Sequence, residues 1–243
     1  MPYRVPVDEK PVPVPAIIGG HCQTDSTVTC RQITALEATG TAASGYTVYA
    51  GGVIDVVRDT ANGGGDYSGF SNLIRFNSQT GALDRNYAPQ FYNILGTLQS
   101  ARVESILVDL PGNAIDVSGK FNRFKQSATS PELVRVGLVK LNLSTGLVDE
   151  TFNANLCSLT NTTCVVNAMV MTGTGAGRKL IIGGRFSQVN GVAKSGFALL
   201  NPKTGALVNT KMQVVFADPI IPVTVANTMP VCQAPNILNT PLT

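Results

Sequence analysis

The sequence predicts an all-β protein built from one repeated antiparallel unit, and three observations support this. Glycine (24 residues) and proline (14 residues) interrupt the 243-residue chain every few positions, which favours many short strands over long helices. Hydrophobic residues make up 44% of the chain and charged residues only 14%, so a chain of this length can bury a sizeable core. The third observation is an internal repeat, which defines the unit itself.

Three stretches of the chain show the same order of features. Each has an alternating apolar strand, a turn, a second strand that ends on small residues, a loop, and a third apolar strand. The third strands read SNLIRFNSQTG, VGLVKLNLSTG and SGFALLNPKTG, and each is followed by a fourth segment, ALDRNYAP, LVDETFNA or ALVNTKMQ. The Thr-Gly pairs that end the third strands, Thr80-Gly81, Thr145-Gly146 and Thr204-Gly205, recur roughly every 60 residues.

Small residues have a structural explanation in this unit. The second strands end on Gly51-Gly52, Ser118-Gly119 and Gly183-Gly184, where missing side chains let neighbouring backbones approach closely. The glycine of each Thr-Gly pair predicts a tight turn, because glycine accepts a positive φ without steric cost. Four antiparallel strands in about 60 residues are typical of a β-propeller blade.

We therefore expect an incomplete or open β-propeller-like array of about three four-stranded antiparallel blades. The expected blades are residues 33–102, 103–165 and 166–212, preceded by an extended Pro-rich arm with a cysteine loop (1–32) and followed by a Pro-rich tail (213–243). A propeller closes with at least four blades, and an unclosed array leaves exposed sheet edges. Three explanations stay open: the tail supplies part of a fourth blade, the chain is a portion of a longer protein, or another copy covers the edges.

The unit also resembles a known repeat family. Its pattern is Gly-Gly-x-Phe, a loop with Asn-Gly, then Thr-Gly-x-x-Asp-x-x-Phe. The matching residues are Gly183, Gly184, Phe186, Asn190 and Gly191 in the third unit, Thr145, Gly146, Asp149 and Phe152 in the second, and Gly51, Gly52, Thr80, Gly81, Asp84 and Tyr87 in the first. The pattern is similar to the delta-60-type β-propeller repeats of secreted and surface-attached bacterial proteins and of fungal cell-cortex proteins.

The resemblance covers about residues 33–212 and implies a propeller fold and an extracellular setting rather than a chemistry. The sequence departs from the family pattern at Ile54, which replaces the first Phe. It departs again at Val208 and Lys211, where Asp and an aromatic residue are expected.

The five cysteines predict two local disulfides. Cys22 and Cys30 bracket one polar loop, and Cys157 and Cys164 bracket another at the equivalent place before a first strand. Disulfides indicate an oxidising, extracellular or cell-surface location. Unrelated buried thiols are the alternative, and zinc binding is disfavoured because it needs closer cysteine pairs or histidines. Cys232 remains, either free or bonded to a partner chain.

Candidate chemical sites are few. Asp59, Asn62 and Asp66 flank glycines in one loop and are weak candidates for calcium, which binds several oxygen ligands. The Gly-Gly pairs do not form a phosphate-binding glycine loop, and no other cofactor is expected. His21, the single histidine, is interpreted as a surface imidazole, so we expect no catalytic triad.

The remaining aspartates give less specific predictions. Asp84 and Asp149 follow the Thr-Gly turns, and we expect each to cap the following backbone. Two carboxylates suffice for glycoside cleavage, and the sequence does not show whether Asp55, Asp59, Asp66 and Asp116 converge. Tryptophan is absent and aromatic residues are 6%, which disfavours a sugar site.

The sequence as a whole predicts a non-enzymatic extracellular structural or assembly protein of a cell surface, fibre or particle. The alternative is an adhesin-like propeller that binds a glycan or protein through variable loops at residues 55–70 and 121–136. The partners expected are proteins or further copies, bound through blade edges and the N-terminal arm, whose alternating Val and Pro favour extended backbone. A net charge of +3, scattered along the chain, and the lack of a long apolar run indicate neither nucleic-acid binding nor membrane insertion. The first 18 residues do not read as a signal peptide.

Overall fold

The computed structural model describes residues 32–41, 43–59, 61, 63–67, 71–93, 101–158 and 164–208, together with the backbone of 16–19, 21–22 and 25–29. Contacts divide the chain into Met1–Asn209 and Thr210–Thr243, and the second unit lies outside the described residues. All strand ladders are antiparallel, so the expected all-β class is confirmed. No helix within the described part of the chain is long and apolar enough to cross a membrane.

Three sheets of the same design follow one another along the chain. In each, three strands pair in sequence order, so the chain meanders from one edge to the other. The first sheet is β4 (Gln32–Thr41), β5 (Gly45–Val53) and β8 (Leu73–Asn77). The second is β10 (Arg102–Asp109), β11 (Ala114–Lys120) and β14 (Leu138–Asn142). The third is β15 (Val165–Thr172), β16 (Lys179–Arg185) and β19 (Phe197–Leu200), with a short 3-10 helix, η2 (Gly175–Gly177), between β15 and β16.

The fourth segment of each unit does not form a strand ladder. It touches the third strand through one isolated bridge, at Phe76–Leu83, Leu141–Val148 or Leu200–Leu207. In the first two units the chain turns away directly afterwards, because Asp84 and Asp149 accept a hydrogen bond from the backbone N–H two residues ahead, both at 3.0 Å. The expectation of four-stranded blades is therefore replaced by three-stranded sheets, each with a single-bridge extension.

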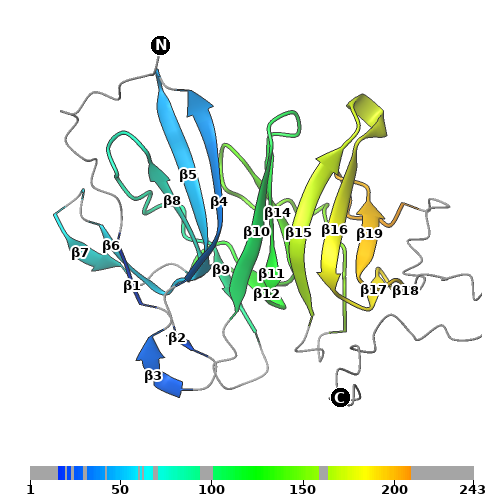
Figure 1. The fold of residues 1–243 in the computed structure, drawn as a ribbon, viewed down its shortest axis with the longest axis horizontal. Coiled ribbons are helices and arrows are strands. Elements are labelled where there is room, and N and C mark those ends of the chain that lie inside the picture. The colour runs from blue at the N-terminus through cyan, green and yellow to red at the C-terminus, as the bar shows by residue number, and fades with distance from the viewer. Residues whose placement is uncertain are drawn as a thin grey trace, which may run out of the picture. The chain divides into compact units, whose positions relative to one another are not determined.

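The three sheets stack face to face in chain order (Figure 1). Strand β10 of the second sheet packs against β4 and β5 of the first, and β10 and β11 pack against β15 of the third. Within the described part of the chain the sheets form an open row, and no closed ring or propeller arrangement is present. The coarse expectation of repeated small antiparallel sheets holds, whereas the propeller itself is not seen.

A hairpin lies between the second and third strands of every unit. These hairpins are β6 (Val56–Asp59) with β7 (Gly65–Tyr67), β12 (Arg123–Lys125) with β13 (Glu132–Val134), and β17 (Gln188–Val189) with β18 (Val192–Ala193). The segments 55–70 and 121–136, which we expected to be variable loops, thus contain paired strands.

The first two hairpins also pair with a strand from the segment that precedes their unit, and the third is held to that segment by hydrogen bonds. Strand β1 (Ala16–Gly19), at the end of the expected N-terminal arm, pairs with β6, and β9 (Gln90–Tyr92) pairs with β12. In the third unit the N–H of Gln188 donates to the carbonyl of Leu156 at 3.1 Å. The remaining strands, β2 (His21–Cys22) and β3 (Asp25–Thr29), pair with each other, and residues 1–15 lie outside the described part.

One glycine in each unit is required by a β-bulge. The first strands shift register at Ile33/Ala35, Val103/Ser105 and Val166/Ala168. Opposite these bulges lie Gly52, Gly119 and Gly184, where an added Cβ would overlap the carbonyl oxygens of Gln32, Arg102 and Val165. A bulge bends its strand and brings the two backbones together, so only glycine fits.

The turns after the third strands are also built alike. The side-chain oxygens of Asn77, Asn142 and Asn201 accept backbone N–H groups two residues ahead, at 2.8, 3.0 and 2.9 Å. The glycines that close these turns, Gly81, Gly146 and Gly205, have φ of 68°, 73° and 74°. The positive φ predicted for the Thr-Gly turns is confirmed.

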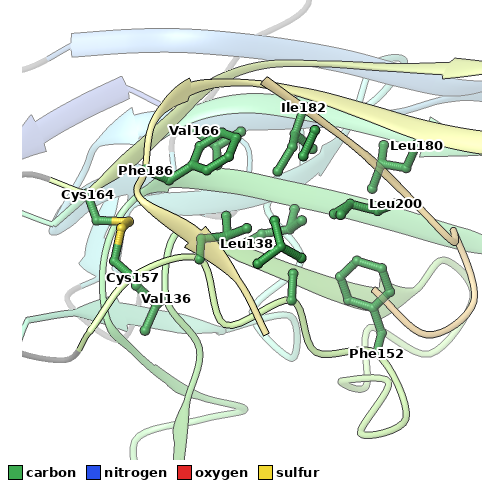
Figure 2. Close-up of a cluster of buried hydrophobic side chains, with 14 residues drawn as sticks. Val136, Leu138, Phe152, Cys157, Cys164, Val166, Leu180, Ile182, Phe186 and Leu200 are labelled. Carbon is green, nitrogen blue, oxygen red and sulfur yellow. A yellow bond between two sulfur atoms is a disulfide. The ribbon is translucent and has the colours of Figure 1, made fainter. Parts of the chain in front are cut away.

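Two apolar cores join the sheets, and they use equivalent positions. The preceding unit contributes Leu73, Tyr87 and Phe91 to the first core, and Leu138, Phe152 and Leu156 to the second. The following unit contributes Val103, Val117 and Phe121 to the first core, and Val166, Ile182 and Phe186 to the second (Figure 2). All these side chains are nearly or fully buried, at 4% exposure or less.

Candidate functional site

One of the two expected disulfides is present in the described residues. Cys157 and Cys164 are bonded, with an S–S distance of 2.10 Å, and both are 4% exposed. The bond lies at the edge of the second core, near Val136 and Phe186 (Figure 2). The side chains of Cys22, Cys30 and Cys232 lie outside the described residues.

Replacing both Cys157 and Cys164 with alanine should lower the free energy of unfolding by about 2–3 kcal/mol, since the bond closes a short loop in the unfolded chain. Denaturant titration of the oxidised protein and the double variant measures this loss. The reduced wild-type protein should fall to the stability of the variant. A double variant as stable as the oxidised protein would contradict this role of the disulfide.

The carboxylates proposed as weak calcium ligands pair with arginines. Asp59 is fully buried and lies 3.0 Å from Arg85, while Asp66 lies 2.7 Å from Arg58 on the neighbouring strand. The hydrogen bond from Arg58 lowers the pKa of the Asp66 carboxyl below its usual value. Asn62 lies outside the described residues.

Two further aspartates have the capping role that the sequence predicts. Asp84 and Asp149 cap the backbone after their turns, as expected, and Asp84 also pairs with Arg75 at 2.5 Å. Among the described residues, no group of three or more His, Cys, Asp or Glu side chains is placed to hold a metal ion. The side chain of His21 lies outside the described residues.

The second and third sheets enclose a charged cleft of about 880 Å³ at the end where their turns meet. Its charged lining residues are Asp109, Lys140, Asp149, Arg178 and Lys203. Asp109 pairs with Arg178 of the β15–β16 connection, so this ion pair links the two sheets. The described residues of the hairpin segments 55–70 and 121–136 are not among those that line this cleft.

Beside the cleft lies a buried ion pair. Asp116 and Lys140 are directly opposite each other on β11 and β14, with Nζ 2.7 Å from Oδ1. The Asp116 and Lys140 side chains are 0% and 4% exposed. Burial raises the pKa of Asp116 to about 6, and the neighbouring Lys140 ammonium opposes part of this rise. Asp116 is therefore held by Lys140 and not grouped with Asp59 and Asp66, which have their own arginines.

The raised pKa of Asp116 predicts a pH dependence of stability. The folded chain binds the carboxyl proton of Asp116 more tightly than the unfolded chain does. The stability that this protonation contributes is therefore complete below pH 4 and is lost as pH rises through about 6. Relative to Asp116→Asn, which does not titrate, the wild type should lose about 2–3 kcal/mol of unfolding free energy between pH 4 and 7. Unfolding titrations of both proteins across this range check it, and a constant difference would contradict it.

The first and third sheets have exposed apolar side chains on β4 and β15, the strands next to their central strands. On the first sheet, Ile33 and Leu36 of β4 are 38% and 64% exposed. On the third sheet, Val170 of β15 is 52% exposed, and Phe197 is partly exposed. Exposed apolar side chains that gather on one sheet face indicate a surface for protein contact.

Sequence reasoning missed several of these residues. Lys140 within the apolar strand GLVKLN was the available signal, because a lysine at a central strand position needs a buried partner. No pattern indicated that Asp109 and Arg178, far apart in sequence, would pair. No protein-family model, curated protein or solved structure matches the chain.

Proposed function

We propose that this chain is a non-enzymatic structural protein that assembles at a cell surface or in an extracellular fibre or particle. The supporting observation is that one inter-sheet packing scheme occurs twice within the chain, while apolar side chains remain exposed on the outer sheets. A row of sheets of this kind extends by adding another sheet to its end, as repeat proteins do. We also propose that the three sheets are blades of the delta-60-type propeller family, as the residue pattern of the repeat suggests.

The positions of the buried charges also support a structural role. Asp59, Asp109 and Asp116 are at most 4% exposed, and each pairs with a basic residue of another strand or connection. Ion pairs between segments of a core fix how those segments align, because a misaligned charge would be buried without a partner. The Cys157–Cys164 bond supports the extracellular setting.

The proposal is tested on protein isolated from its native source. We expect the chain in the secreted or surface fraction, with Cys157 and Cys164 oxidised, and in a complex larger than one chain. Alkylation before and after reduction reports the thiols, and native mass measurement reports the complex. A single chain with reduced thiols in the cytosolic fraction would contradict the proposal.

A further inference from the structure

The third sheet has an apolar face that is partly exposed, with Val170 at 52% and Leu199 at 8% exposure. Two rows of side chains cross this sheet on the side away from the second sheet. The rows are Ala168, Gly183 and Phe197, and Val170, Ile181 and Leu199, and we call them together the outer face. All six residues are apolar, whereas the equivalent rows of the second sheet include the Asp116–Lys140 pair. The outer face thus carries no charge that would have to be satisfied on contact with another surface.

In the first and second sheets, the corresponding face is covered by the next sheet along the chain. Gly51 is equivalent to Gly183, and an added Cβ at Gly51 would lie 2.9 Å from Val103 Cβ and 3.1 Å from Ile106 Cδ1. In the second sheet Ser118 has this position, and its hydroxyl donates to the carbonyl of Val166 at 3.2 Å. An added Cβ at Gly183 meets no atom of the described residues within 4 Å, so none of these residues takes the place over Gly183 that Val103 takes over Gly51.

The first sheet carries, on its strand β4, exposed side chains equivalent to those that pack over Gly51. Val103 and Ile106 lie on β10 opposite Gly119 and Val117, and Ile33 and Leu36 lie at the same places on β4, opposite Gly52 and Ala50. Val103 and Ile106 are 0% and 7% exposed, because they pack on the preceding sheet. Ile33 and Leu36 are 38% and 64% exposed.

We propose that a second copy of this chain docks head to tail, with Ile33 and Leu36 of one copy packing over Gly183 on the outer face of the other. The two surfaces are different and complementary, so one contact leaves a free surface at each end. Such a contact forms an open filament or, where the rotation between copies closes, a ring. This inference rests on the proposed function and names the partner for it.

The internal interfaces explain why a second copy is the occupant. The contact repeats a packing that the chain already makes twice, with a β-branched residue over a small residue: Val103 over Gly51, and Val166 over Ser118. Both halves of the unused contact occur on one chain, so identical chains supply each other.

Two variants disable opposite halves of the contact. Gly183→Val places a side chain where the partner would pack, and Leu36→Glu places a charge on the docking strand. Leu36 is 64% exposed and an added Cβ at Gly183 meets no described atom within 4 Å, so we expect both variants to keep the fold. We expect the wild type to associate with increasing concentration. For each variant alone, the dissociation constant should be higher by a factor of about ten or more. An equal mixture of the variants keeps one intact interface and should form a heterodimer that grows no further.

Analytical ultracentrifugation of the full chain, alone and mixed, measures these masses. Gly65→Val is the matched control, since Gly65 lies on β7 with no described atom within 4 Å of an added Cβ, and it should associate like the wild type. A wild type that stays monomeric, variants that associate normally, or a mixture without heterodimer would each overturn the inference. If the purified chain is monomeric but the native protein lies in a larger surface complex, the proposed function stands and only the second copy is excluded as partner.

Discussion

Gly184→Ala is expected to lower the free energy of unfolding by about 1–3 kcal/mol, the range typical of overpacked sites. The added methyl group would overlap the Val165 carbonyl oxygen and approach Val166 Cα to 2.8 Å. Both atoms belong to the backbone of the β15 bulge, so a side-chain rotation cannot make room. The methyl group must instead push β15 and β16 apart, which disturbs the strand that packs on the second sheet.

The adjacent residue provides the control. Gly183→Ala adds the same methyl group to the opposite face of β16, where no atom of the described residues lies within 4 Å. This change should leave stability unchanged or raise it by about 0.4–1 kcal/mol, because it restricts the unfolded chain. Chemical denaturation of the two variants at one protein concentration measures the difference. Equal losses, or no loss for Gly184→Ala, would show that the bulge does not need glycine.

Lys140→Met is expected to cost about 3–5 kcal/mol of unfolding free energy at pH 7.5, because it leaves the Asp116 carboxylate buried without its partner. Lys140 lies 2.7 Å from that carboxylate, and the Asp116 side chain is 0% exposed, so little of the lost interaction is recovered from solvent. The loss should be smaller at pH 5, where Asp116, whose pKa is about 6, is largely protonated.

The double variant Asp116→Leu/Lys140→Met separates the pair from its packing. Removing both charges should recover most of the loss, since an apolar pair of similar volume often replaces a buried ion pair without penalty. Unfolding titrations of the single and double variants at both pH values measure the coupling between the residues. A double variant as unstable as Lys140→Met, with no pH dependence, would mean that the carboxylate is not the cause.

The repeat was predictable because its signals are local. Turn residues such as Asn142 and Gly146 determine the backbone within a few positions of themselves. Glycines such as Gly184 are required opposite a bulge on the adjacent strand. Alternating strands and Thr-Gly turns therefore located the strands of the three sheets. The disulfide between Cys157 and Cys164 was predictable for the same reason, since the two residues are close in sequence.

The features that sequence reasoning missed depend on contacts between distant segments. The hairpin β12–β13 was expected to be a loop, and its pairing with β9 joins residues of two different units. The Asp109–Arg178 ion pair exists only because the second and third sheets stack. The alternation of apolar and polar residues also does not distinguish a fourth strand from a segment that makes one isolated bridge. The fourth segment carries the apolar residue that makes the bridge, Leu83 in the first unit and Val148 in the second, and so it looks like a strand in sequence.

The most direct test of the stacked-sheet account is the nuclear Overhauser effect between the Hα protons of Gly51 and the methyl protons of Val103. Gly51 lies in the first sheet and Val103 in the second, and the account places Val103 directly over Gly51. Specific methyl labelling of valine should give strong cross-peaks between these protons in the isolated chain. Cross-peaks within each sheet but none between Gly51 and Val103 would mean that the sheets form without stacking, and the account would be wrong.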